Sequence, residues 1–158
     1  MITIRNATYD DLKTIIDMGE DLQNESREFE PLLVFKWQDS FDHYATELRN
    51  QNAKIIVAED PTAGVVGYQY SYVTLLDYLE RQNTECTLEA LYVSSDFRGQ
   101  GIAKELVRHA ERWAIDEKKA DRIKAGIYVG NAASEAVHIK DGFTPYYTEY
   151  VKFTSMNE

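Results

Sequence analysis

The sequence predicts a mixed α/β fold in a single domain, and three observations support this class. The chain has 158 residues, enough to bury a layered core, and its 44% hydrophobic and 28% charged residues are typical of a globular protein. Segments with strand periodicity and with helix periodicity alternate along it. A strand, a helix and a strand within residues 84–129 predict a parallel pair. No linker composition divides the chain, so we expect one domain over residues 1–158.

The first third predicts a strand and two helices. Ile2–Arg5 alternates like a short strand, and Thr8 with Asp11 has the spacing of a capping box that begins a helix. The apolar stripe of that helix ends near Leu22 and comprises Leu12, Ile15, Ile16, Gly19 and Leu22. Polar residues 24–31 predict a loop. A second stripe predicts a helix that packs into the core: Trp37, Phe41, Tyr44, Ala45 and Leu48.

A hairpin is predicted next. Lys54–Glu59 and Gly64–Val73 are rich in branched and aromatic residues, and turn-forming residues 60–64 separate them. Alternation places four residues of the second strand on one face, where they pack under a helix or line a pocket: Val66, Tyr68, Tyr70 and Tyr72. Packing is the commoner role for such a face.

The second half predicts two further strands and two helices before a last strand. Thr84–Val93 is a strand, and a loop over Ser94–Gly101 leads into a helix whose apolar face runs from Ile102 to Ala114. Arg122–Val129 reads as its parallel partner. The remaining elements are a short helix opened by Asn131 and ending near Lys140 at Asp141-Gly142, and a strand over Tyr146–Phe153.

Composition excludes several classes of function. A formal charge of −10 opposes binding to phosphate backbones, so nucleic acid is not an expected partner; the charge either attracts cationic substrates or serves solubility. We find no signal core or membrane-length apolar run and expect a cytoplasmic protein with no membrane partner. Cys86 stands alone and the three histidines lack metal-ligand spacing, so no metal site is predicted.

A glycine loop carries the main chemical signal. Gly99 and Gly101 follow a strand and open a helix, where free amides and the helix dipole both favour an anion. Arg98 can add a charge-assisted contact. The glycine spacing matches neither a P-loop nor a dinucleotide fingerprint, which argues against a kinase, a P-loop hydrolase and an NAD enzyme. The loop alone either binds a phosphate of another ligand or is only a turn before a helix.

Here the sequence resembles the GCN5-related N-acetyltransferase (GNAT) family. Leu88-Glu89-Ala90-Leu91-Tyr92-Val93 followed by Arg98-Gly99-Gln100-Gly101-Ile102-Ala103 looks like the family's central motif, in which Arg98, Gly101 and Ala103 occupy the signature positions. Asn131 and the pair Gly142-Phe143 stand where the family opens and closes its last helix. The order of elements also matches, so the resemblance covers the whole chain.

The resemblance implies a fold and a cofactor. The fold is a mixed, twisted sheet flanked by helices, with strands 4 and 5 splayed apart around acetyl-CoA as co-substrate. Pyrophosphate would sit on the amides of the glycine loop, and the pantetheine arm would pair with the strand before it. The cofactor-binding residues so implied are Leu91, Tyr92, Val93, Arg98, Gly99, Gln100, Gly101, Ile102, Ala103, Asn131 and Ser134.

The implied activity is transfer of the acetyl group to a primary amine, of a small cation or of a protein, by direct attack in a ternary complex. Glu89 matches a general base, although a carboxylate facing solvent is the plainer role. His138 stands where the family often has a tyrosine as acid; it donates a proton as imidazolium or only packs over the pantetheine. Tyr146, Tyr147 and Tyr150 are other candidate donors.

Three matters stay open in the sequence. Acidic residues in the first helical loop and around residues 75–85 predict an acceptor site for a cation: Glu25, Glu28, Glu30, Asp77, Glu80 and Glu85. An alternative function is a CoA-binding regulatory domain without turnover, which the His138 departure motivates. The tyrosine-rich carboxyl end either pairs across a homodimer or completes the sheet.

Overall fold

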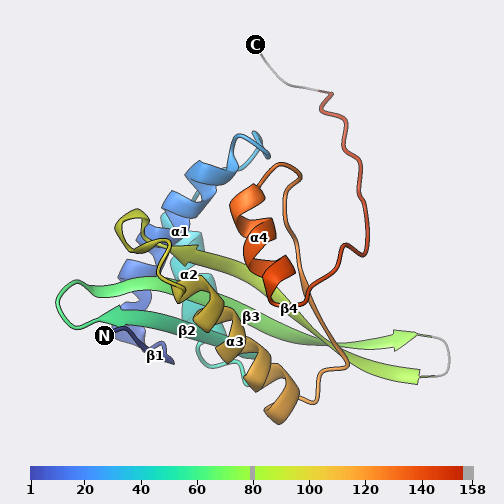
Figure 1. Cartoon of the computed structure of the whole chain (residues 1–158), viewed down its shortest axis with the longest axis horizontal. Helices are drawn as coiled ribbons and strands as arrows, with labels where there is room; N and C mark the ends of the chain where they lie inside the picture. Colours follow the sequence, from blue (N-terminus) through green and yellow to red (C-terminus); the bar gives the residue numbers. More distant parts are fainter. Residues whose placement is uncertain (79–80, 155–158) are drawn as a thin grey trace.

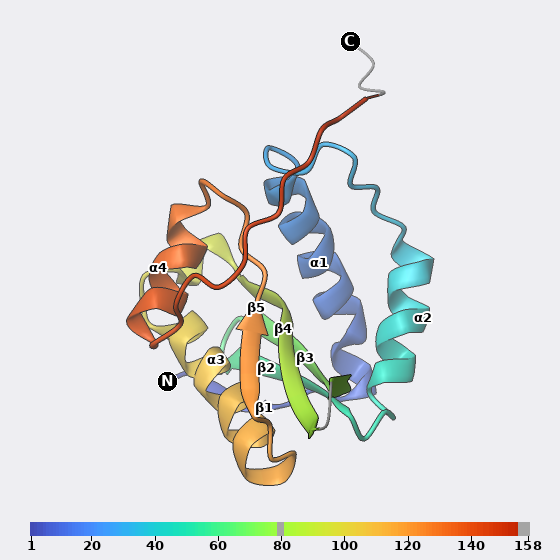
Figure 2. The same ribbon diagram turned by 90° about the vertical axis from the view of Figure 1, so that its right-hand side faces the viewer.

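A five-stranded sheet forms the centre of the molecule. The computed structural model describes residues 1–78 and 81–154, and the strands lie in chain order across the sheet. They are β1 (Thr3–Asn6), β2 (Ala53–Asp60), β3 (Gly64–Tyr78), β4 (Arg81–Val93) and β5 (Arg122–Ala125). Helices α1 (Leu12–Ser26) and α2 (Trp37–Glu47) lie on one side of the sheet (Figure 2). Helices α3 (Ile102–Arg112) and α4 (Ala132–Lys140) lie on the other, which gives the mixed three-layer arrangement of Figure 1.

The predicted parallel pair is confirmed, and it is short. All other neighbours in the sheet are antiparallel, whereas β4 and β5 are parallel. Their pairing runs only from Glu85 opposite Arg122 to Leu88 opposite Ala125. Beyond Leu88 the two strands separate, which is the splaying that the resemblance implied. Correspondingly, β5 ends at Ala125 and not at Val129, because the later residues have no strand beside them.

A bulge corrects one sequence prediction about β3. Ala58 pairs with Gly67 while Glu59 pairs with Val65, so Val66 has no partner across the hairpin. An unpaired residue of this kind shifts the alternation of side chains between the two faces of the sheet by one position. Val66 therefore packs in the cluster under α3, whereas Tyr68 and Tyr70 pack in the cluster under α1. The prediction that all four residues share a face was wrong at Val66.

The start of α1 follows the predicted capping box, but its end does not follow the prediction. The Thr8 amide donates to Asp11 Oδ2 at 2.7 Å, and a 3-10 turn over Tyr9–Asp11 leads into the helix. The helix continues to Ser26, beyond Leu22, and Ser26 Oγ donates to the Leu22 carbonyl at 2.8 Å. This bond folds the Ser26 side chain back onto the last turn, where polar residues alone had indicated a loop.

Helix α2 is less buried than its stripe predicts. Tyr44 and Leu48 pack against the cluster under α1, but no residue of α2 is fully buried and Trp37 is 37% exposed. The helix covers the outer side of α1 and the edge of β2, so its apolar face meets other elements along only part of its width (Figure 2).

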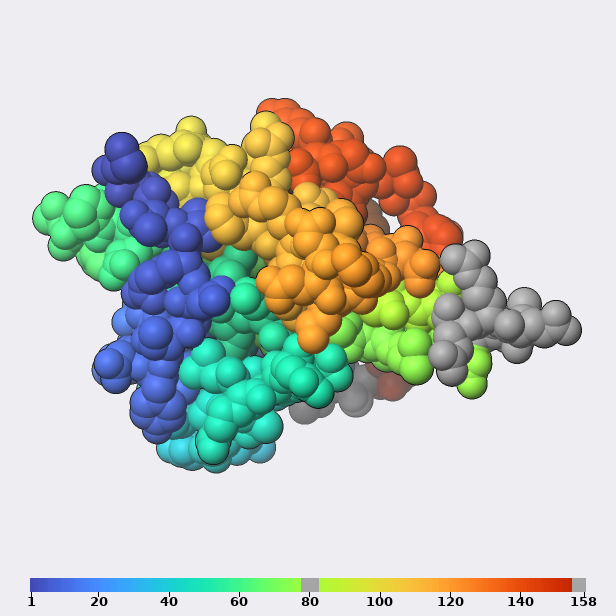
Figure 3. Space-filling view, turned by 90° about the horizontal axis from the view of Figure 1, so that it is seen from below, coloured from blue at the N-terminus to red at the C-terminus, as the bar shows by residue number. Residues whose placement is uncertain are grey.

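The β3–β4 hairpin is longer than predicted. Its strands continue past Val73 and begin before Thr84, and the hairpin leaves the body of the molecule (Figures 1 and 3). The polar residues in this region do not end the strands, because a two-stranded hairpin that extends beyond the core has no face that must be apolar. The predicted last strand, by contrast, is absent: residues 146–153 are extended without a strand partner in the described chain.

Candidate functional site

A second bulge places Glu89 at the point where the sheet opens. Tyr70 pairs with Ala90 and Ser71 pairs with Leu88, so Glu89 has no partner in β3. Leu88 consequently faces the α3 cluster while Ala90 faces the α1 cluster. Glu89 itself is exposed and lines the cleft. The sheet therefore presents this carboxylate at the end of the β4–β5 pairing.

Gln69 supports this bulge, and the sequence gave no reason to single it out. Its side chain is completely buried, and Nε2 donates to the Tyr70 carbonyl at 2.9 Å. The carbonyl lies at the register shift, where the regular ladder is interrupted. A buried glutamine in a strand of aromatic residues was the only signal of this function.

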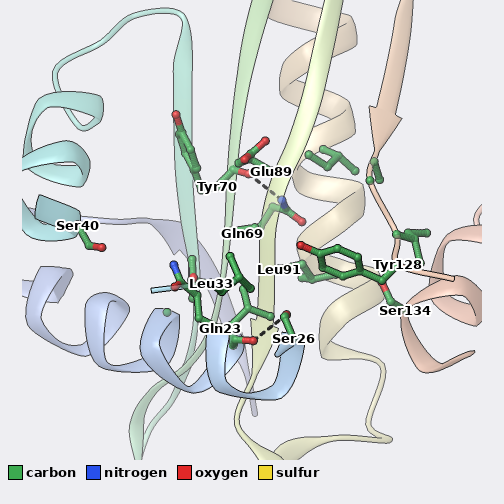
Figure 4. A pocket seen from close by; sticks show the side chains of 18 of the residues that line it. Gln23, Ser26, Leu33, Ser40, Gln69, Tyr70, Glu89, Leu91, Tyr128 and Ser134 are labelled. Carbon is green, nitrogen blue, oxygen red and sulfur yellow. Dashed lines mark hydrogen bonds between the residues drawn. The ribbon is translucent and has the colours of Figure 1, made fainter. Parts of the chain in front are cut away.

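The cleft has a volume of about 510 Å³ and is formed by both layers of helices and the open sheet (Figure 4). The α1–α2 side contributes Gln23, Ser26, Leu33 and Ser40, and the sheet contributes Tyr70, Glu89 and Leu91. Residues 125–128 and three side chains of α4 or its cap close the opposite side: Asn131, Ser134 and His138. The structure thus brings the predicted site residues Glu89, Leu91, Asn131, Ser134 and His138 together around one space.

The glycine loop follows the carboxyl end of β4, and its residues do not line the cleft. Gly99 and Gly101 have φ of 77° and 82°, a backbone region that residues with a Cβ rarely adopt. A Cβ at either position would meet no atom within 4 Å, so conformation and not crowding requires glycine here. Gly101 is the N-cap of α3, and the first amides of a helix have no intrahelical partner. The loop therefore ends at unpaired helix amides, an arrangement that favours an anion.

The side chain of Arg98 is already engaged within the protein. Nε donates to the Val93 carbonyl at 2.7 Å, and a terminal nitrogen lies 2.8 Å from Glu25 Oε1. The guanidinium carbon also lies 5.2 Å from the centre of the Tyr92 ring. Arg98 therefore ties the glycine loop to β4 and to α1.

Helix α4 begins and ends as its sequence predicts. Asn131 Oδ1 accepts from the Ser134 amide at 3.2 Å, which is an N-cap bond. At the other end, the Gly142 amide donates to Ile139 and the Phe143 amide donates to His138, with Gly142 at φ 93°. These two bonds form a Schellman motif, which explains the pair Gly142-Phe143.

His138 lines the cleft although only 4% of its surface is exposed. Nδ1 lies 2.8 Å from the Ser134 carbonyl, and the ring meets Phe143 edge to face at 5.2 Å. A carbonyl accepts only, so Nδ1 carries the proton and the neutral ring has an unprotonated Nε2. His138 can therefore donate a proton from Nε2 only as imidazolium.

An aromatic contact outside the sequence predictions links the two sides of the cleft. Tyr128 stacks on Phe29, with ring centres 5.8 Å apart and planes inclined by 10°. Burial raises the pKa of Tyr128, with smaller contributions from Glu30 and Glu89. The loop after α1 is thereby joined to the segment between β5 and α4.

The acidic residues that the sequence predicted for the acceptor site do not line the cleft in the described residues. Glu85 is buried between Arg122 and Lys124, which lower its pKa against the opposing effect of burial, and Glu25 pairs with Arg98. Glu80 lies outside the described residues. The carboxylates that line the cleft are Glu89 and Asp39.

The described residues contain neither a metal-binding cluster nor a membrane-spanning helix. No group of three or more histidine, cysteine or acidic side chains in these ranges has the arrangement of a metal site. No helix among the described residues combines the length and apolar character needed to cross a membrane.

The fold and site define an α/β protein whose sheet opens between two parallel strands to form a ligand cleft. The model of the acetyltransferase (GNAT) family matches residues 17–143, and the chain belongs to this family. Family membership supports acetyl transfer as the general reaction. No curated protein matches the sequence.

Solved structures share this fold at low sequence identity. A transcriptional regulator from Bacillus halodurans C-125 is 22% identical with a TM-score of 0.78, over 98% of this chain and 100% of that one. The aminoglycoside N-acetyltransferase AAC(6')-Iy in complex with CoA is 20% identical with a TM-score of 0.73, over 99% and 95%. A second structure of AAC(6')-Iy, with a bisubstrate analogue, is 19% identical with a TM-score of 0.72, over 99% of each chain.

Proposed function

We propose that this protein transfers the acetyl group of acetyl-CoA to the primary amine of a small molecule, by direct attack in a ternary complex. The observation that carries the proposal is the Glu89 bulge, which presents a carboxylate in a cleft that both parallel strands and α4 border. The likeness to an aminoglycoside N-acetyltransferase solved with a bisubstrate analogue supports a small amine as acceptor.

The residues present fit acetyl-CoA. The left-handed glycines and free α3 amides of residues 98–103 would hold the pyrophosphate. The edge of β4 near Leu91, with Asn131 and Ser134 opposite, would hold the pantetheine arm. When bound, acetyl-CoA supplies the thioester carbonyl that the amine attacks.

Proton transfer is assigned to two residues. An alkylamine with a pKa of about 10.4 is mostly protonated at neutral pH and lacks a free lone pair, so Glu89 would accept its proton directly or through water. His138, with Nδ1 held by Ser134, would protonate the leaving thiolate from Nε2 only as imidazolium.

The test is release of free thiol from acetyl-CoA in the presence of a panel of amines. Glu89→Gln should lower kcat by about 10²- to 10⁴-fold while leaving the dissociation constant of CoA unchanged. Asp39→Asn is the matched control, because it removes the other cleft carboxylate. Asp39 lies on α2, which is not part of the glycine loop, so this change should act mainly on the KM of the amine. No thiol release above the hydrolysis blank with any amine would contradict the proposal.

A second candidate is a CoA-binding regulatory domain without turnover. The likeness to a structure described as a transcriptional regulator favours it, as does the histidine at position 138. This function predicts CoA binding with no transfer. Glu89→Gln and His138→Phe should then leave the affinity for CoA unchanged. Failure to bind CoA by calorimetry would contradict both candidates.

A further inference from the structure

The Tyr128 ring extends into the cleft from the segment between β5 and α4, toward the strand that carries Glu89 and Leu91 (Figure 4). Phe29 covers one face of this ring, with the ring centres 5.8 Å apart and the planes inclined by 10°. The Phe29 ring also reaches Gly130, since a Cβ at that position would lie 3.5 Å from Phe29 Cε1. Phe29 therefore holds the orientation of the Tyr128 ring from one side.

The opposite face of Tyr128 is open. The residue remains 41% exposed although Phe29 stacks on it. An aromatic ring has two faces and Phe29 covers one, so the exposed surface belongs to the other face and to the ring edge. The face of an aromatic ring carries the negative part of its quadrupole, which attracts a cation.

The charges around Tyr128 favour the same kind of ligand. Glu89 lines the cleft with it, and Glu30 follows Phe29 in the loop after α1; after burial, these two carboxylates raise the pKa of the Tyr128 hydroxyl. A negative field that opposes ionisation of a phenol attracts a cation to the same place. Within the described ranges, no lysine or arginine side chain lines the cleft to neutralise that field.

We propose that Tyr128 binds the ammonium group of the amine substrate on its open face, beside Glu89, and so makes the enzyme specific for a cationic acceptor. The inference rests on the proposed function and adds to it a residue that recognises charge. The ring and the carboxylate attract the protonated amine together. When an N–H bond of the ammonium breaks, the proton passes to a Glu89 carboxylate oxygen, directly or through water, and the electron pair stays on nitrogen as the attacking lone pair.

The first experiment measures binding without acetyl-CoA, so its result does not depend on turnover. Choline and its neutral analogue, in which carbon replaces the nitrogen, have the same shape, but only choline is charged. Ligand-observed NMR titration should give choline a dissociation constant lower than that of the analogue by at least about threefold. Equal affinity for the two compounds, or no binding of choline, would overturn the proposal.

Substitutions at position 128 separate the aromatic face from the hydroxyl and from simple apolar volume. Tyr128→Phe and Tyr128→Trp keep an aromatic face and should bind choline at least about as tightly as the wild type. Tyr128→Leu should raise the dissociation constant of choline by about 3- to 30-fold and leave that of the neutral analogue unchanged. Tyr9→Leu is the matched control, because Tyr9 is 62% exposed and contacts Phe41 away from the cleft.

The outcomes at position 128 distinguish charge recognition from packing. If Tyr128→Leu weakened both compounds equally, or if it bound choline as tightly as Tyr9→Leu, the cation site would be refuted. Thermal melting of each variant checks that it is folded. If choline binds as expected but no amine releases thiol from acetyl-CoA, the proposed function fails and the cation site stands. Where an amine is acetylated, Tyr128→Leu should raise its KM more than it lowers kcat.

Discussion

Replacing Arg98 by alanine tests whether this residue is a structural support as well as a ligand contact. The substitution removes the bond from Nε to the Val93 carbonyl at 2.7 Å, and Val93 is buried with 7% of its surface exposed. A hydrogen bond from a charged group contributes about 1.5–3 kcal/mol, and losing it leaves a buried acceptor unpaired. The ion pair with Glu25 adds little, about 0–1 kcal/mol, because both side chains are about half exposed.

We therefore expect Arg98→Ala to lower the free energy of unfolding by about 2–3 kcal/mol, dominated by the bond to the Val93 carbonyl. In a domain of this size that corresponds to a fall in Tm of about 4–12 °C. Glu25→Gln is the control and should cost about 1 kcal/mol or less. Urea titration and calorimetric melting, each without ligand, are the assays.

The reasoning would be refuted in two ways. Arg98→Ala could melt at the wild-type temperature, which would mean that its bond to β4 contributes nothing without a ligand. Alternatively, Glu25→Gln could destabilise the protein as much as Arg98→Ala, which would place the stabilisation in the surface ion pair.

Three further predictions concern the bulge, the close approach of two strands and a buried acid. Gln69→Leu leaves the Tyr70 carbonyl without its partner at the bulge, so we expect a loss of about 1–3 kcal/mol and a larger effect on kcat than on CoA affinity, measured by urea titration and steady-state kinetics. Gly67→Ala places a Cβ 2.9 Å from the main chain of β4 and should lower the free energy of unfolding by about 1–3 kcal/mol in a urea titration. An unchanged midpoint would show that β4 shifts to make room for the methyl group at no cost. Burial, then an adjacent carboxylate, raises the pKa of Glu111 to about 7. The folded state therefore binds this proton more tightly, and stability should fall as the pH rises from about 4.5 to 7, a slope that Glu111→Gln should remove from the Tm profile.

Local chemistry fixed several elements that the sequence predicted correctly. Thr8 with Asp11 starts the first helix, Asn131 caps α4, and Gly142-Phe143 ends it. Each depends on residues within about one helical turn, so the information is contained in the local sequence. The glycine loop is of the same kind, since Gly99 and Gly101 adopt φ values that few other residues tolerate.

The tertiary structure decided the features that depend on register and on partners distant in sequence. Both bulges in the sheet, at Val66 and at Glu89, arise from pairing between strands, and the sequence alternation alone gave no sign of them. The hydrogen bonds from Arg98 to the Val93 carbonyl and to Glu25 likewise join residues up to 73 positions apart in the sequence. Tyrosine-rich residues 146–153 show the same limit, because strand propensity requires a neighbouring edge before a strand can form. The sequence by itself determined the family, the order of elements as far as α4, the start of α1 and both ends of α4. Long-range pairing determined which side chains face the cleft.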